Sequence, residues 1–133
     1  MTIAQGLLTE LRGDAGVSAL VGTRVWQEFA PQNAALPYIT FQRTSTATTL
    51  TLDGVDTLRN IRYQLDIYAA TIASANAVKS AVGGLLDGKS DTLDTEPIEF
   101  CYIEGEQDLS ELEMDGAKRR VSLQLNINAH EEY

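Results

Sequence analysis

The chain has 133 residues, of which 44% are hydrophobic, and it carries a formal net charge of −9. This length predicts one domain over residues 1–133 with its own core, and the charge argues against a protein that binds nucleic acid through phosphate contacts. The one cysteine, Cys101, cannot form an internal disulfide. No apolar stretch reaches the roughly 20 residues of a membrane span. We therefore expect a soluble cytoplasmic protein without membrane contacts.

Two short helices and two strands are predicted in the N-terminal third. A stripe of apolar residues predicts a first helix that Gly13 ends, and Asp14 can cap a second, shorter helix. Residues 24–29 then predict a strand, which a proline breaks. A further strand begins near Pro37, because a residue without an N–H is tolerated where a strand starts. Tyr38 should lie on the solvated side of that strand.

The clearest alternation of apolar and polar side chains runs through residues 58–69. A period of two predicts a strand with one buried and one solvated face. The two sets are Ile61, Tyr63, Leu65 and Ile67 on the buried face and Arg62, Gln64 and Asp66 on the solvated face. Before this strand, residues 44–57 are rich in threonine, which favours extended backbone, and contain the turn-forming pair Asp53-Gly54. They predict an extended hairpin arm that becomes ordered on binding a neighbour.

A helix and two strands complete the expected fold. Thr71 can cap a helix over residues 72–86, whose apolar face should cover the sheet. Gly83-Gly84 each cost about 1 kcal/mol relative to alanine within a helix, so they could bend this helix or end it early. Residues 98–104 predict a strand and 105–116 an acidic loop, and the last strand, 121–128, has apolar side chains inward and polar ones outward. The predicted fold class is therefore α+β: a mostly antiparallel sheet packed against a long helix, with a short N-terminal helical segment and an extended hairpin arm.

Few residues of this chain have catalytic potential. His130 has no serine or cysteine partner nearby in sequence, and nothing close to Cys101 would lower the pKa of its thiol. Residues 83–90 (GGLLDGKS) satisfy the written pattern of a phosphate-binding loop, but they end a helix pattern where that loop needs a strand before it and a helix after it. The acidic residues lack the spacing of a calcium loop. We predict no catalytic residue, no cofactor and no metal site, and hence no enzyme.

Charges are unevenly distributed along the chain. Ten acidic residues and no basic one occur between residues 91 and 115, shortly before the basic triplet Lys118-Arg119-Arg120. On one interpretation the acidic segment is a solvated loop that the triplet balances within one subunit. On the other, the triplet pairs with acids of a neighbouring copy and the excess acid faces a channel. The candidate interface residues are Arg62, Asp66, Glu106, Asp108, Glu111, Lys118, Arg119 and Arg120.

The order of the packing patterns is more informative than any one of them. The segments concerned are 17–25, 36–41 (LPYITF), 52–54 (LDG), 61–69 (IRYQLDIYA) and the small-residue helix from Thr71. In this order they resemble the tail-completion, or tail-terminator, proteins of phages with long non-contractile tails and of related prophages. The resemblance covers nearly the whole chain and contains no catalytic motif.

The resemblance implies a homo-oligomeric ring, expected to be a hexamer, on the head-proximal end of the phage tail tube. Such a ring stops polymerisation of the tail tube protein and presents a docking face to the head-tail connector protein. DNA passes through its channel without specific binding. The protein would then be part of the virion tail, assembled in the host cytoplasm.

Three alternatives differ in the partner that the chain would bind. A head-side neck adaptor would also form a ring but would bind the portal. A small nucleotide-binding protein would use the match at residues 83–90. A generic oligomeric adaptor would serve an assembly outside any virus.

Overall fold

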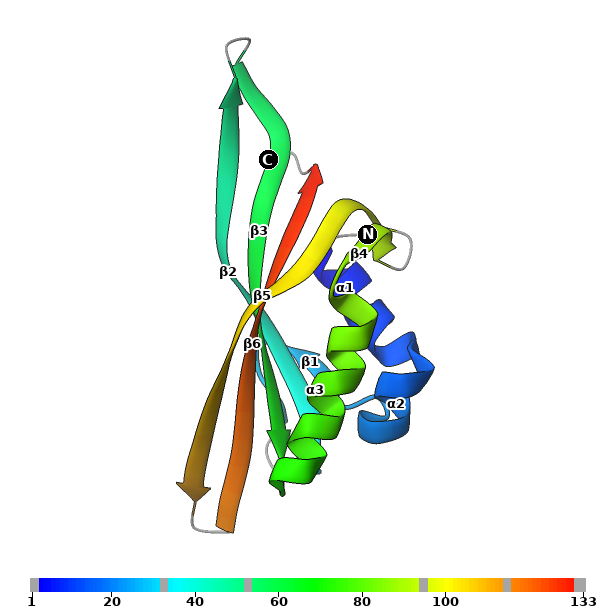
Figure 1. Cartoon of the computed structure of the whole chain (residues 1–133), viewed down its shortest axis with the longest axis vertical. Helices are drawn as coiled ribbons and strands as arrows, with labels where there is room; N and C mark the ends of the chain where they lie inside the picture. The colour runs from blue at the N-terminus through cyan, green and yellow to red at the C-terminus, as the bar shows by residue number, and fades with distance from the viewer. Residues whose placement is uncertain (1–2, 32–33, 52–53, 94–95, 114–115, 131–133) are drawn as a thin grey trace.

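The computed structural model describes residues 3–31, 34–51, 54–93, 96–113 and 116–130. Within them the chain forms three helices and one six-stranded sheet (Figure 1). The helices are α1 (Ile3–Gly13), α2 (Ala15–Val21) and α3 (Ile72–Leu86). The strands are β1 (Val25–Gln27), β2 (Tyr38–Thr51), β3 (Gly54–Ala69), β4 (Lys89–Leu93), β5 (Glu96–Glu113) and β6 (Gly116–His130).

The strands follow the order β1-β2-β3-β6-β5-β4 across the sheet. Only β1 and β2 pair in parallel, and the other four pairings are antiparallel. The three helices lie on one side of this sheet (Figure 1), where α3 packs against β3, β5 and β6 and α1 packs against β1 and β4. The prediction of an α+β fold with a mostly antiparallel sheet is confirmed.

The predicted helix starts agree with the structure. The Asp14 carboxylate accepts a hydrogen bond from the N–H of Val17 at 3.0 Å, and the Thr71 hydroxyl accepts one from the N–H of Ser74 at 3.1 Å. Each side chain thereby satisfies an N–H that the first turn of its helix leaves without a partner. The predicted helix over residues 72–86 has the bounds of α3.

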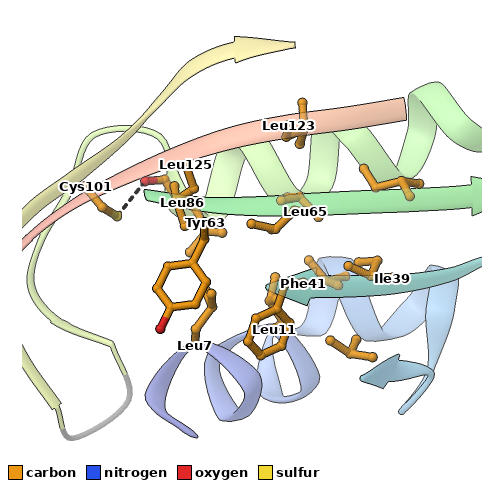
Figure 2. Packing of buried hydrophobic residues seen from close by; sticks show 14 of the residues in the cluster. Leu7, Leu11, Ile39, Phe41, Tyr63, Leu65, Leu86, Cys101, Leu123 and Leu125 are labelled. Carbon is orange, nitrogen blue, oxygen red and sulfur yellow. Dashed lines mark hydrogen bonds between the residues drawn. The ribbon is translucent and has the colours of Figure 1, made fainter. Parts of the chain in front are cut away.

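The core lies between the helices and the apolar face of the sheet (Figure 2). The alternation read in the sequence predicts this face correctly, because the apolar sets of β3 and β6 all point into it. Its largest fully buried side chains include Leu7 and Leu11 of α1, Phe41 of β2, Tyr63 and Leu65 of β3, Leu86 of α3 and Leu123 of β6.

Two hairpins extend to opposite ends of the long axis of the molecule (Figure 1). In each, the outer strand has a register shift, between Arg43 and Ser45 in β2 and between Ile103 and Gly105 in β5. We define the β2–β3 arm as residues 44–51 and 54–57, and the β5–β6 arm as residues 105–113 and 116–118. In each arm, one side is the part of β2 or β5 that follows the register shift. The other side is the part of β3 that precedes its pairing with β6, or the part of β6 that precedes its pairing with β3.

The expectation of an acidic loop over residues 105–116 is wrong. β5 runs unbroken from Glu96 to Glu113 and pairs with β6 as far as Glu113↔Gly116. The backbone register places Glu111 directly opposite Lys118. The sequence did not predict β4 either, since its polar stretch KSDTL shows no clear alternation.

Candidate interaction surface

The second face of the sheet has no helix packed on it in the part of the chain that the structure describes (Figure 1). The sequence predicts this face to be solvated, yet several of its polar side chains are buried. Thr40, Asp66, Ser122 and Asn126 are between 2% and 7% exposed. Asp66 accepts hydrogen bonds from Gln64 and Arg120, and Asn126 hydrogen-bonds to Asn60 and Glu104, so polar groups of this face form an ordered network.

Three asparagines form a hydrogen-bonded ladder across β3 and β6. The amide of Asn60 donates to the side-chain oxygen of Asn126 at 2.6 Å and to that of Asn128 at 3.1 Å. The Asn126 amide in turn donates to a Glu104 carboxylate oxygen at 2.7 Å, which extends the ladder to β5. A shared network of this kind fixes the side chains and links three adjacent strands on the helix-free face.

Two of the predicted interface residues, Arg62 and Asp66, have ion-pair partners in their own chain. Arg62 contacts Glu104 at 3.2 Å, with its side chain 53% exposed. Asp66 contacts Arg120 at 3.2 Å, and here the two side chains are only 9% and 22% exposed. The guanidinium of Arg120 also lies over the ring of Tyr68, 5.7 Å from its centroid. The Asp66–Arg120 pair is therefore part of the sheet and balances charge within one subunit.

An aromatic cluster lies at the β1–β2 end of the same face. The rings of Tyr38 and Tyr68 stack with centroids 4.9 Å apart, and Trp26 meets Tyr38 edge-on at 5.7 Å. Tyr38 lies on the predicted side of its strand, but it is only 8% exposed there rather than solvated. The reason is its cross-strand partner: register places Tyr38 directly opposite Tyr68, whose ring covers it.

The remaining predicted interface residues belong to the β5–β6 hairpin. Glu106 contacts Lys79 of α3 at 3.5 Å, and Asp108 is exposed. The backbones of Glu111 and Lys118 face each other in the register, while their side chains lie outside the described part of the structure. The guanidinium Nε of Arg119 is buried without a hydrogen-bond partner among the described atoms. The structure thus gathers these residues on one hairpin.

Cys101 and His130, the two residues considered for catalysis, each contact groups of the fold. Burial raises the pKa of the Cys101 thiol to about 11, and its Sγ donates to the Leu86 carbonyl at 3.0 Å (Figure 2). Such a thiol stays protonated at neutral pH and is a poor nucleophile. His130 contacts Glu99 at 3.3 Å, with both side chains more than half exposed.

The nucleotide-loop pattern of residues 83–90 does not have the required geometry. Its first residues lie in the last turn of α3, and its last two begin β4. A helix therefore precedes it and a strand follows it, the reverse of a phosphate-binding loop. In the described residues there is also no group of three or more side chains suited to hold a metal ion, and no helix long and apolar enough to cross a membrane.

A comparison with protein families identifies the family of this chain. The family model of tail completion protein gp17 matches residues 5–129, a span that holds almost all of the helices and strands. The chain belongs to this family. Membership of the tail completion family confirms the resemblance inferred from the order of packing patterns, and it is a family of structural tail proteins.

A solved structure supports the fold of this tail completion protein. The chain is similar to a chain of the virion of a native gene transfer agent particle, with 22% identity and a TM-score of 0.72. The match covers 97% of this chain and 95% of the other. At this identity it shows that the fold is shared. The search of curated proteins found no match.

Sequence reasoning missed the two features that order the helix-free face. The asparagine ladder could have been found, because Asn126 and Asn128 alternate with apolar residues and so share a face. The aromatic cluster gave no such signal, because Trp26, Tyr38 and Tyr68 come from three strands whose pairing the sequence did not specify.

Proposed function

We propose that this tail completion protein forms a closed homo-oligomeric ring, a hexamer, at the head-proximal end of a phage tail tube. The ring stops polymerisation of the tail tube protein and gives the head-tail connector protein its docking face. The subunits assemble in the host cytoplasm and remain in the virion tail. The observation that carries this proposal is the family match over residues 5–129.

The shape of the subunit supports a role at a junction. A ring subunit between tube and connector has to contact two neighbours and two further partners, which requires several different surfaces. This chain offers a helix layer, a polar sheet face and two arms at opposite ends of its long axis (Figure 1). The arms can contact neighbouring copies while the other surfaces remain available to the tube and the connector.

Among the candidate interface residues, the β5–β6 hairpin is the best placed to contact a neighbour. We assign the contact to Asp108, Glu111, Lys118 and Arg119, because Arg62, Asp66, Glu106 and Arg120 have partners in their own chain.

The charge of the subunit suits a channel for DNA. With a net charge of −9, a ring of this protein repels the phosphate backbone at long range. The two ion pairs on the helix-free face leave few uncompensated cations there. DNA can therefore pass without being held, and the purified protein should not retain duplex DNA at physiological salt.

Electron microscopy of tail tubes tests the proposal. Purified protein is added to growing tubes of the tail tube protein, and images are compared with those of tubes grown alone. We expect a ring on one end of each tube and an end to growth at that end. Tubes that grow equally long with bare ends would contradict the proposed termination.

Pull-down experiments separate this function from that of a neck adaptor. Immobilised tail tube protein should retain the chain, whereas immobilised portal protein without tubes should not. Retention by portal alone would instead identify a head-side adaptor. The Leu65→Ala variant, whose core is destabilised, is the control for misfolding. Stronger retention of this variant than of the wild type would show that the resin binds unfolded protein.

A further inference from the structure

The outermost strands of the sheet are too short to cover their neighbours. β1 has 3 residues and pairs with β2 only at 39–41, and β4 has 5 residues and pairs with β5 only at 96–101. In the described chain no strand lies along the outer edge of β2 over 44–51 or along that of β5 over 105–113. Such edges present backbone N–H and C=O groups that can pair with another chain.

The outer edge of β2 lacks two of the usual protections against pairing, charge and proline, although its register with β3 shifts between Thr48 and Leu50. Residues 44–51 read TSTATTLT, without a charge or a proline, and threonine favours extended backbone. Soluble proteins commonly protect a long edge with lysine, proline or a covering segment. An uncharged edge without proline is therefore expected to be covered when the protein is assembled.

The edge of β5 has the opposite chemistry. β5 contains seven acids and no base, namely Glu96, Glu99, Glu104, Glu106, Asp108, Glu111 and Glu113. β2 contains no acid, and its single charge is Arg43. Like charges at facing positions of two strands are destabilising. Two β5 edges would thus repel each other, whereas a β2 edge can approach a β5 edge without repulsion.

The two edges also lie on opposite sides of the sheet and toward opposite ends of the molecule (Figure 1). A contact between two different surfaces of the same chain repeats head to tail and closes into a ring if the rotation allows it. We propose that the β2 edge of one copy pairs with the β5 edge of the next, so that the arms join neighbouring sheets. This inference rests on the ring of the proposed function and specifies how its subunits meet.

Backbone alternation identifies which N–H of β5 points outward. On the β4 side, the N–H of Ile103 donates to the Asp87 carboxylate and the carbonyl of Cys101 accepts from Gly88, both at 3.0 Å. Before the register shift, the backbone N–H and C=O groups of odd-numbered β5 residues therefore point away from β6. After the shift, those of even-numbered residues do so. The N–H of Asp108 points away from β6.

The same argument applies to β2. On the β1 side, the N–H of Ile39 donates to the Arg24 carbonyl at 3.0 Å, and the Phe41 carbonyl accepts from Glu28 at 2.7 Å. After the shift, the backbone N–H groups of even-numbered β2 residues point away from β3, and that of Thr46 is one of them. Proline at 46 or 108 removes an outward N–H while sparing the hydrogen bonds within the subunit.

Two proline variants test the pairing, each with an alanine control. Thr46→Pro and Asp108→Pro should each be monomeric by analytical ultracentrifugation under conditions in which the wild-type protein forms rings. Thr46→Ala keeps the N–H and should form rings as the wild type does. Asp108→Ala also keeps the N–H and loses only a side-chain contact with the neighbour, so it should still form rings, but at higher protein concentration. When the two proline variants are mixed, the intact β5 edge of one meets the intact β2 edge of the other. The mixture should therefore form one-to-one dimers, which also demonstrates that both variants are folded.

Each other outcome overturns the inference. Rings formed by both proline variants would show that the edges are not used, while the proposed ring would remain. Proline variants that stay monomeric after mixing would exclude this head-to-tail pairing. A wild-type protein that forms no ring, even with tail tubes present, would contradict the proposed function and the inference together.

Discussion

The middle of the sheet and its two arms use the same strands in different ways. In the middle, Tyr63 and Leu65 are each 1% exposed beneath the helices. In the arms, β2 and β5 each have one edge that no described strand covers. This difference indicates that stability and assembly depend on different residues of one sheet, so that a substitution can alter one property and spare the other.

The largest expected effect is that of a cavity in the middle of the sheet. Leu65→Ala should lower the free energy of unfolding by about 2–5 kcal/mol, since it removes buried methyl groups and leaves a void. Thr46→Ala, in the β2–β3 arm, should change it by less than about 0.5 kcal/mol. Urea unfolding of both variants measures the contrast. Equal losses would mean that the arm contributes to the core.

The buried thiol beneath the sheet gives a second test, through pH. Burial raises the pKa of Cys101 from 9.0 to about 11, so the protonated thiol stabilises the folded state fully below pH 9. This contribution is lost as the pH rises through 11. The reason is that the thiol ionises at lower pH in the unfolded chain than in the folded protein, so that ionisation lowers the free energy of the unfolded state more. Between pH 8 and pH 11 the stability difference between wild type and Cys101→Ala should shift against the wild type by about 2 kcal/mol. Urea unfolding across that range measures it, and an unchanged difference would contradict the burial of the thiol.

A smaller effect is expected on the helix-free face. Arg120→Ala leaves the buried Asp66 carboxylate without its cation and should lower the free energy of unfolding by about 1–3 kcal/mol. Thermal and urea unfolding at neutral pH would detect this loss. If Arg120→Ala abolished ring formation at unchanged stability, its main partner would be in a neighbouring copy.

The smallest effect is expected for the more exposed ion pair beside the asparagine ladder. Arg62→Ala removes the contact with Glu104, but the Arg62 side chain is 53% exposed and solvent already screens the pair. The free energy of unfolding should fall by less than about 1 kcal/mol. A loss as large as that for Arg120→Ala would show that this pair holds the asparagine ladder in place.

The sequence was sufficient for the elements that are amphipathic. Strand 58–69 and helix 72–86 show the periods of their elements, and α3 continues through Gly83-Gly84 to the expected end at Leu86. The hairpin over residues 44–57 followed from its threonines and its Asp-Gly turn, and its strands are present in the described residues on either side of that turn.

The β5–β6 arm could not be predicted because its evidence is non-local. Along β5, the acids at 104, 106, 108, 111 and 113 indicate a solvated loop when read alone. They lie in a strand because this segment pairs with β6 as far as Glu113↔Gly116, a pairing that the local sequence does not show. The candidate interface was likewise predicted only in part, since charge pattern could not show that Arg120 binds Asp66 across two strands.

Hydrogen exchange of free and tube-bound protein tests the central claim most directly. If the arms mediate assembly, the backbone amides of 44–51 and 105–113 should exchange at least about tenfold more slowly in the bound protein, while those of 61–67 stay unchanged. Equal protection of both arms in the free and bound protein would contradict the account.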